Sequence, residues 1–393
     1  MGPIVALFLL NGIGQAVFMP FAPAILASRG FSAEAIGLLG AIVSVMFVAS
    51  AWGWGHLADV VIGRARALRA ATLLSAAMLA GFALPLPIAL LGAVYVAYAA
   101  TSATIMPLSD ALAVNALPNP ARQYGPLRGL LSGTFAVTGV GLGFLYATVG
   151  YGPAVPILIV VVLPVAVLAG RLADVGRATL AGGRRGGAMR EALHVQARLP
   201  AILLAIALAS IGVFAGLTFL PLRIIQLGGG PVEIAFATSS TAIVELLVMP
   251  LVSRFLARTG LRSVMAASCL VLAAVFVWFA VAPSPLLIVI ASLAYGVGWS
   301  GLWVGSVTTM RALLPASLQG SGQSLLSVTT GGVAAFIANA GGGLLWANAG
   351  APVVFAIVAA AALTAALVGW LSFPQDARPV GDLAAPGNAA SAG

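Results

Sequence analysis

Ionisable side chains inside apolar segments are the groups in this sequence best suited to do chemistry. Of the nine acids, seven stand at the ends of apolar segments or in the polar stretches between them. The other two, Asp110 and Glu245, stand within long apolar segments. Burial favours the neutral form of a carboxyl group, so an acid at such a position can take up and release a proton. Asp110 and Glu245 are therefore the candidate proton carriers, and a permanently hydrogen-bonded structural acid is the alternative.

Asp110 has a candidate partner, whereas Glu245 has no basic residue at its depth. Asp110 lies about two helical turns before the Pro118 turn, and Arg128 lies about one helical turn after that turn, so a salt bridge between the fourth and fifth segments is within reach. Arginine does not release its proton at working pH. We therefore expect Arg128 to act through its charge, and one role for the pair is to lock a gate.

Polar and aromatic side chains recur at helical spacing in five apolar segments, so each set shares one helix face. Aromatic faces around a polar centre suit a flat ring, such as an aromatic acid, a nucleobase or a sugar. The alternative is that the rings fill contacts between helices or anchor the chain at the membrane interface. The predicted cavity residues are Asn11, Gln15, Phe18, Tyr95, Tyr98, Ser102, Thr241, Tyr295, Trp299, Trp303, Gln323 and Ser327.

The composition predicts the elements that position these residues. The chain is 61% hydrophobic and 7% charged, with a mean hydropathy of +1.12, which excludes a water-soluble fold and predicts an all-α polytopic membrane protein. Twelve apolar segments are each long enough to span a bilayer. They cover about 4–28, 35–57, 68–87, 89–117, 125–149, 153–172, 200–225, 232–257, 263–282, 286–313, 322–347 and 352–373.

The charge distribution predicts the orientation. All 18 basic residues are arginine, and only Arg29 and Arg223 fall outside the loops that lie on the same side as the termini. By the positive-inside rule both termini are cytoplasmic, in a multi-pass protein of the cell (inner) membrane. Short basic loops explain the pI near 11, so no nucleic-acid partner is expected; the expected partners are a small-molecule substrate and the bilayer, and the protein is expected to be a monomer.

The chain divides into two similar halves. A polar connection rich in arginine separates an N-terminal six-helix bundle, residues 1–172, from a C-terminal one, residues 200–373. The connection, 173–199, is predicted to be a cytoplasmic linker, and the Ala-, Gly- and Pro-rich tail, 374–393, to be disordered. Turn residues repeat between the halves at offsets of 198 or 199, as Pro23, Gly30 and Glu34 match Pro221, Gly228 and Glu233. Two parallel six-helix pseudo-repeats are the predicted architecture.

The charged turn after the second segment resembles a motif of major facilitator superfamily transporters. It reads Gly55-x-Leu57-x-Asp59 followed by Gly63-Arg64-x-Arg66. In that family the glycines let two helix ends approach, and the aspartate bonds helix N-termini or arginines across the cytoplasmic gate. Three residues separate Asp59 from Gly63, where the family usually has two. Without the resemblance, the same turn would be an ordinary basic loop.

Shorter fragments resemble the phenylpropionate-permease-like branch, beside the lactose-permease-like and nucleoside proton symporters. They include Leu108-Ser109-Asp110, Tyr124-Gly125-x-x-Arg128 and Phe219-Leu220-Pro221-Leu222. The resemblance implies proton-coupled uptake of a small organic solute (aromatic carboxylate, nucleoside or sugar) by alternating access. It also implies a second role for Asp110 and Arg128, because lactose-permease-like symporters hold substrate with a carboxylate and an arginine on these helices.

Other classes lack the residues that they need. The sequence has no Gly-rich phosphate loop bearing a lysine, no HExxH or GxSxG motif, and no histidine within a predicted span. We therefore expect no enzymatic activity, no metal and no cofactor, with the proton gradient as energy source. The functional alternatives are a proton-driven efflux antiporter of drugs or metabolites and a non-transporting substrate sensor derived from the same fold.

Overall fold

The computed structural model describes residues 2–172 and 188–373, and within these ranges every regular element is helical. In the described part of the chain, twelve spans, each a single helix or a run of consecutive helical segments, are long and apolar enough to cross a membrane. The predicted all-α fold with twelve spans is therefore confirmed. The predicted tail, 374–393, and residues 173–187 of the predicted linker lie outside the described residues.

Within residues 2–172, the N-terminal half consists of eight α-helices and one π-helical segment. Three of its spans are irregular: the first is interrupted at residues 19–21, the second ends in the π-helix, and the fourth is interrupted at residues 103–104. The elements are α1 (Gly2–Phe18), α2 (Ala22–Ser28), α3 (Ala33–His56), η1 (Leu57–Val61), α4 (Arg64–Phe82), α5 (Ile88–Ser102), α6 (Ile105–Ala116), α7 (Pro120–Val149) and α8 (Ala154–Arg171).

The third span differs from its predicted range of 68–87. The helix begins at Arg64 because Gly63, with φ of 89°, ends the preceding turn. It ends at Phe82 because Pro85 and Pro87 follow, and proline cannot continue a helix. Arg64 and Arg66, which the predicted range left in the loop, therefore belong to the first turn of α4.

The C-terminal half repeats this arrangement and begins after a short helix, α9 (Ala188–Val195), which lies in the predicted linker and packs against α14. Its eleventh span contains a second π-helical segment, at Val328–Ala334. The elements are α10 (Leu199–Gln226), α11 (Pro231–Thr259), α12 (Leu261–Val281), α13 (Pro285–Leu313), η2 (Ala316–Leu318), α14 (Gln319–Ser327), η3 (Val328–Ala334), α15 (Ala335–Ala349) and α16 (Ala351–Ser372).

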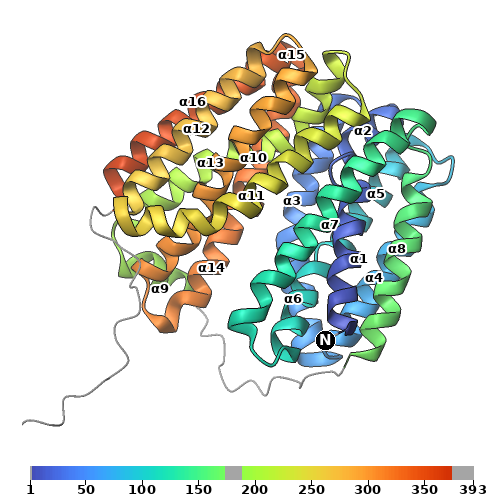
Figure 1. The fold of residues 1–393 in the computed structure, drawn as a ribbon, viewed down its shortest axis with the longest axis horizontal. Coiled ribbons are helices and arrows are strands. Elements are labelled where there is room, and N and C mark those ends of the chain that lie inside the picture. The colour runs from blue at the N-terminus through green and yellow to red at the C-terminus, as the bar shows by residue number, and fades with distance from the viewer. Residues whose placement is uncertain (1, 173–187, 374–393) are drawn as a thin grey trace, which may run out of the picture.

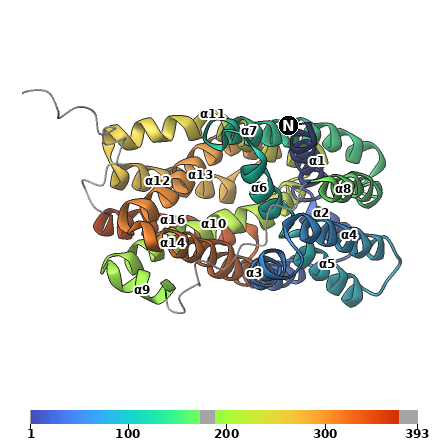
Figure 2. The ribbon, with the colours of Figure 1, turned by 90° about the horizontal axis from the view of Figure 1, so that it is seen from below.

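Figures 1 and 2 show two groups of helices, α1–α8 and α10–α16, side by side. The principal contacts between the groups join α3 to α15 and α7 to α11. The groups approach closely near α2 and the end of α15, and they lie apart near α6 and α14, on the side of the N-terminus (Figure 1). We call the first the closed end and the second the open end.

The pseudo-repeat is visible in the backbone. The described glycines with positive φ form three pairs, and both members of each pair occupy the same turn of their halves. An aromatic contact also repeats: Phe21 packs on Tyr146 in the first half, and Phe219 packs on Trp346 in the second. The glycine pairs, with their φ values, are Gly30 (90°) and Gly228 (85°), Gly63 (89°) and Gly260 (81°), and Gly150 (73°) and Gly350 (82°).

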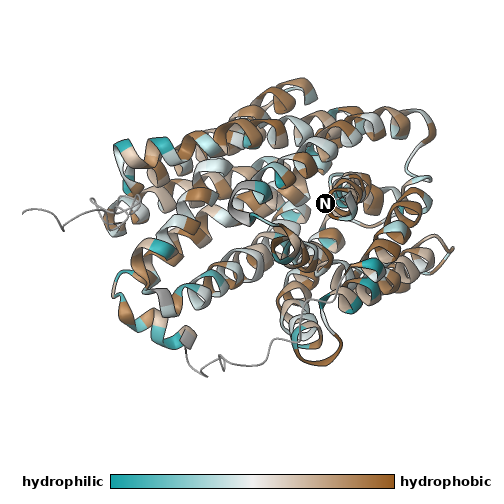
Figure 3. Cartoon of the chain, turned by 60° about the horizontal axis from the view of Figure 1, so that its bottom comes forward, coloured by the Kyte–Doolittle hydropathy of each residue, from teal (hydrophilic) through white to brown (hydrophobic). Residues whose placement is uncertain are grey.

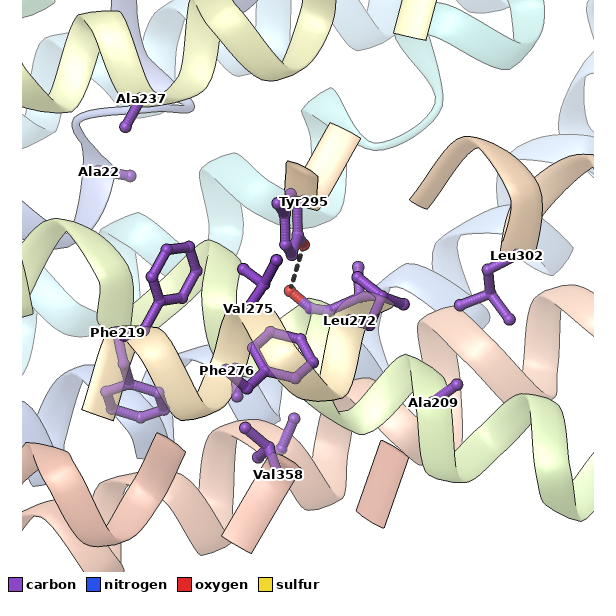
Figure 4. Close-up of a cluster of buried hydrophobic side chains, with 14 of the residues drawn as sticks. Ala22, Ala209, Phe219, Ala237, Leu272, Val275, Phe276, Tyr295, Leu302 and Val358 are labelled. Atoms are coloured by element: carbon purple, nitrogen blue, oxygen red, sulfur yellow. Dashed lines mark hydrogen bonds between the residues drawn. The ribbon is translucent and has the colours of Figure 1, made fainter. Parts of the chain in front are cut away.

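Apolar side chains cover the outside of the helices as well as the core. Figure 3 shows hydrophobic residues along the length of the helices and hydrophilic ones mainly near helix ends. Val137, Leu247 and Leu371 are more than half exposed, as expected for a surface that faces lipid tails. In the core of the C-terminal half, Tyr295 packs on Phe276 and its hydroxyl donates a hydrogen bond to the Val213 carbonyl at 3.2 Å (Figure 4). This bond ties α13 to α10.

Candidate functional site

A cavity of about 370 Å³ lies between the two halves. Its size is at the lower end of the range for small-molecule pockets, about 300–1,000 Å³. None of its lining residues is Asp, Glu, Lys, Arg or His. The N-terminal half contributes Met19, Pro20, Ala22, Pro23, Gly40, Val43, Ser44, Phe47 and Tyr95; the C-terminal half contributes Phe214, Gly216, Leu217, Thr218, Leu220, Pro221, Ile224, Ile234, Ala237, Thr238, Thr241, Tyr295, Gly331, Ala335 and Asn339.

Irregular backbone positions part of this wall. Pro20 stands where α1 ends, Pro221 lies inside α10, and Gly331 belongs to the π-helix η3. Within a membrane, interrupted helices are tolerated where they are buried in protein or line a cavity, because exposed backbone polar groups are costly in lipid. The irregular backbone of the first and eleventh spans therefore forms part of the site.

A buried amide, Asn339, is the most polar side chain of the wall. Its Oδ1 accepts a hydrogen bond from Thr218 Oγ1 at 2.6 Å, and its Nδ2 donates to the Ala335 carbonyl at 2.8 Å. The side chain is 5% exposed, and Gly40 of α3 packs directly on it. Asn339 is not among the residues predicted from the sequence to line the cavity. A lone amide in an apolar segment was the available signal, because burying such a group is unfavourable unless it makes hydrogen bonds.

Three of the predicted cavity residues line this cavity. Tyr95 comes from α5, where its ring lies 6.2 Å from that of Phe18. Thr241 comes from α11 and donates to the Ser292 carbonyl at 3.1 Å, and Tyr295 comes from α13. Each half thus supplies one tyrosine to the wall.

Glu245 lies on α11, one turn beyond Thr241, and is not a lining residue of the cavity. The Trp299 indole and the Tyr295 side chain lie near its carboxyl group. The Trp299 ring packs on Trp303 at 5.4 Å between centroids. Among residues 2–172 and 188–373, no ion pair involves Glu245. Tyr295, which lines the cavity, thus lies between the cavity and the surroundings of Glu245, and within the described residues no basic side chain pairs with this acid.

Asp110 and Arg128 form the predicted salt bridge between α6 and α7. Arg128 Nη1 lies 3.3 Å from Asp110 Oδ2 and 3.4 Å from Oδ1, and Tyr124 is a further side-chain partner of Asp110. The side chains of Arg128 and Asp110 are 45% and 26% exposed. Neither residue lines the cavity. In this conformation the pair joins two helices of one half.

The remaining predicted cavity residues make contacts within one half and do not line the cavity. Asn11 Nδ2 donates to Ser109 Oγ at 3.1 Å, and Gln15 Nε2 lies 3.6 Å from Met106 Sδ, so both join α1 to α6. The other contacts are those of Phe18 with Tyr98 (rings 5.5 Å apart), Ser102 with the Ala99 carbonyl, Gln323 with the Val307 carbonyl, and Ser327 with the Gln323 carbonyl.

The motif after α3 contains a π-turn that accounts for its unusual spacing. The Ile62 amide donates to the Leu57 carbonyl, five residues earlier, at 2.9 Å, so the π-helix accommodates one residue more than an α-turn. Asp59 Oδ1 accepts a hydrogen bond from Arg64 Nε at 2.9 Å. In this conformation Asp59 therefore pairs with Arg64, the first residue of α4, which follows it by five residues in the same turn. Gly55 has open space around its α-carbon, and Arg66 is exposed.

Small residues bring the two halves together towards the closed end. An added Cβ at Gly37 of α3 would lie 2.7 Å from the Gly343 Cα and 2.5 Å from the Asn339 carbonyl oxygen, both in α15. Between α7 and α11, Ser239 Oγ donates to the Ala136 carbonyl at 3.0 Å. Backbones therefore touch across the interface where glycine allows it, as in other closely packed membrane helices.

Comparison with solved structures identifies the same architecture. A crystal structure of a variant of the nucleoside transporter NupG superposes with a TM-score of 0.83 at 15% sequence identity, covering 95% of this chain and 99% of that one. A crystal structure of a peptide transporter POT variant in complex with alafosfalin gives a TM-score of 0.74 at 14% identity, covering 94% and 93%. No curated protein sequence matches this chain. Residues 5–357 match the MFS_1 like family, so the chain belongs to that family and has the fold of major facilitator transporters.

Proposed function

We propose that this protein is a secondary active transporter that couples uptake of a small organic solute to inward proton flow. The observation that carries the proposal is the cavity between the two halves, with the halves in contact at one end and apart at the other. An enclosed site between two six-helix repeats serves alternating access, in which the halves rock around a fixed site. The similar folds of a nucleoside transporter and a peptide transporter, and the resemblance to the phenylpropionate-permease-like branch, support transport of a small molecule.

Each contact has a role in this cycle. The glycine-lined contact of α3 with α15 forms the barrier at the closed end, and it separates when the halves rock. The solute binds in the cavity, whose wall comes from both halves, so closing either end encloses it. The Asp59–Arg64 and Asp110–Arg128 pairs stabilise helix ends of the first half near the opposite gate.

Glu245 is the proposed proton carrier. It lies one turn from the cavity residue Thr241 and beside Tyr295, so hydration of the site also changes the solvation of this carboxyl group. Without an arginine in contact, the neutral acid is the favoured form until water enters, and the proton is then released. Asp110, which is paired with Arg128, is the second candidate.

The orientation follows from the arginine distribution. With both termini in the cytoplasm, the open end, where the N-terminus lies, faces inwards and the closed end faces outwards. We propose the cell membrane as location, a monomer as working unit, no enzymatic activity and no energy source other than the proton gradient.

The test is the Glu245→Gln variant in proteoliposomes with an imposed proton gradient. Glutamine mimics the protonated acid permanently, so proton-driven accumulation should be lost while exchange of labelled solute across the membrane continues. Glu34→Gln is the matched control, because Glu34 is an exposed acid in the first turn of α3. Uridine, glucose and 3-phenylpropionate serve as labelled probes. Accumulation by Glu245→Gln equal to that of the control would place the coupling acid elsewhere, and absence of counterflow for every probe in the unaltered protein would contradict the transport function.

A further inference from the structure

We propose that the cavity binds an uncharged, hydroxyl-bearing ring, the chemistry that nucleosides and sugars share, and that Asn339 is the principal side chain that binds it. This inference rests on the proposed function and narrows its substrate class. It selects against aromatic carboxylates, which were among the solutes expected from the sequence.

The wall of the cavity carries no charged side chain. Tyr95 and Tyr295 are the ionisable side chains among its lining residues, and neither is charged at neutral pH. The nearby Arg223 of α10 donates hydrogen bonds to the carbonyls of Phe279, Ala280 and Ala282 at the end of α12. It also donates to Gln226 Oε1, at the end of its own helix. A carboxylate or phosphate that entered the cavity would lose its hydration without gaining a counter-charge, which is strongly unfavourable.

Several polar groups of the wall are placed to accept hydrogen bonds. The hydroxyl groups of Ser44, Thr238 and Thr241 each donate to a backbone carbonyl of their own helix, which leaves their oxygen lone pairs to accept. The Asn339 amide nitrogen donates one hydrogen to Ala335, and no other hydrogen bond of this nitrogen occurs within the described residues. A wall of acceptors with one free amide donor complements a solute rich in hydroxyl groups.

Most of the remaining wall is apolar. Val43, Phe47, Phe214 and Leu217 line the cavity together with the two tyrosines. Flat C–H or π faces of a ring pack well on aromatic and aliphatic walls, while the ring substituents reach the polar groups. A charged group on a solute would meet no opposite charge on this wall. A compact ring with hydroxyl groups, in contrast, can contact both its apolar and its polar side chains.

Asn339 also connects the site to the conformational change. Its side chain forms part of the wall and its carbonyl oxygen lies against Gly37 of α3, in the contact between the halves. A solute held by this amide is therefore bound next to the contact that must separate during transport. For this reason we expect Asn339, and not the threonines of the cavity wall, to make the principal contact with the solute.

The first experiment compares neutral and anionic members of matched pairs by equilibrium binding to the purified full-length protein. The pairs are uridine with uridine 5′-monophosphate, and glucose with glucuronate. We expect at least one neutral compound to bind, with its anionic partner weaker by about a hundredfold or more. The two pairs distinguish nucleoside from sugar. Equal or tighter binding of an anionic member, tighter binding of 3-phenylpropionate, or binding of neither neutral compound would overturn the inference.

The second experiment tests the amide with a control on the same helix. Asn339→Ala should weaken the neutral ligand about tenfold, the loss of a good hydrogen bond. Asn348→Ala should leave its affinity unchanged, because Asn348 is an exposed residue of α15 with an equivalent bond to the Leu344 carbonyl. If Asn339→Ala fails to fold, Thr218→Val removes the hydroxyl that orients the amide and should weaken binding several-fold.

These results separate the inference from the proposed function. Unchanged affinity in Asn339→Ala, or in Thr218→Val where that variant replaces it, would overturn the role of the amide. Proton-driven uptake of 3-phenylpropionate without binding of uridine or glucose would retain the transporter and reject the substrate class. Binding of a neutral compound without counterflow would support the substrate class and contradict transport.

Discussion

Replacing Gly37 with alanine tests whether the contact at the closed end sets the conformational equilibrium. An added Cβ would lie 2.5 Å from the Asn339 carbonyl oxygen and 2.7 Å from the Gly343 Cα. Both atoms belong to the α15 backbone, so no side-chain rotation relieves the overlap. Overpacking of this kind costs about 1–3 kcal/mol. Because it strains only the state in which α3 and α15 touch, it should shift the ratio of the two states about 5- to 150-fold towards separation at this end.

Cysteine labelling measures this shift. The chain has a single cysteine, Cys269, which is buried, so a Cys269→Ser background allows one reporter to be added. Thr238→Cys places that reporter on the cavity wall. A membrane-impermeant maleimide, added to intact cells, reaches it through the outer end in the proposed orientation. Gly37→Ala should raise the labelling rate by at least about fivefold, the lower limit of the shift.

Gly341→Ala is the matched control. Gly341 lies on α15 within two residues of Gly343, but an added Cβ there would meet nothing within 4 Å. It should leave the labelling rate unchanged, while both variants keep a similar helix propensity. Equal labelling of the two variants would show that the contact between α3 and α15 does not determine the equilibrium, and the assigned closed end would be wrong.

Two further substitutions test polar contacts at helix ends. Asp59→Asn removes the partner of Arg64 from a half-exposed pair, so the free energy of unfolding should change by less than about 1 kcal/mol while turnover falls several-fold; wild-type turnover would exclude a gating role. Arg223→Met leaves three carbonyl oxygens at the end of α12 without their donor and should cost about 1–3 kcal/mol. Its thermal midpoint should fall below that of Arg258→Met, a substitution of an exposed arginine at the end of α11, and equal midpoints would refute this account.

The spans were predictable because each depends on local composition. An apolar run of this length is a helix wherever it crosses a bilayer, since only internal hydrogen bonding satisfies its backbone. The turns were predictable from glycine: Gly30 and Gly228, paired by sequence offset, share nearly the same positive φ. The third span was misplaced because hydropathy excludes arginines that in fact form the first turns of α4.

The site was less predictable because helical spacing assumes an unbroken helix. Tyr95, Tyr98, Ser102 and Asp110 share a face only if the fourth span is straight, and it is interrupted between α5 and α6. Tyr95 therefore lines the cavity while Asp110 pairs with Arg128. A local pattern cannot predict this break, which lies in a run of Ala, Ser and Thr without proline until position 107. Asn339 was missed for a different reason, since its importance arises from α3 and α10 packing around it.

The separation of the solute site from the proton site has an energetic consequence. In the proposed cycle the cavity carries no charge and the proton resides on Glu245, one turn away on α11. Tyr295 belongs to the cavity wall and to the surroundings of the acid, so a solute that displaces water from the cavity also changes the solvation of the carboxyl group. By linkage, any factor by which the bound solute alters proton affinity is the factor by which the proton alters solute affinity. An uncharged wall suits this coupling, because a permanent charge beside Glu245 would hold one protonation state in both conformations and weaken the link between proton and solute.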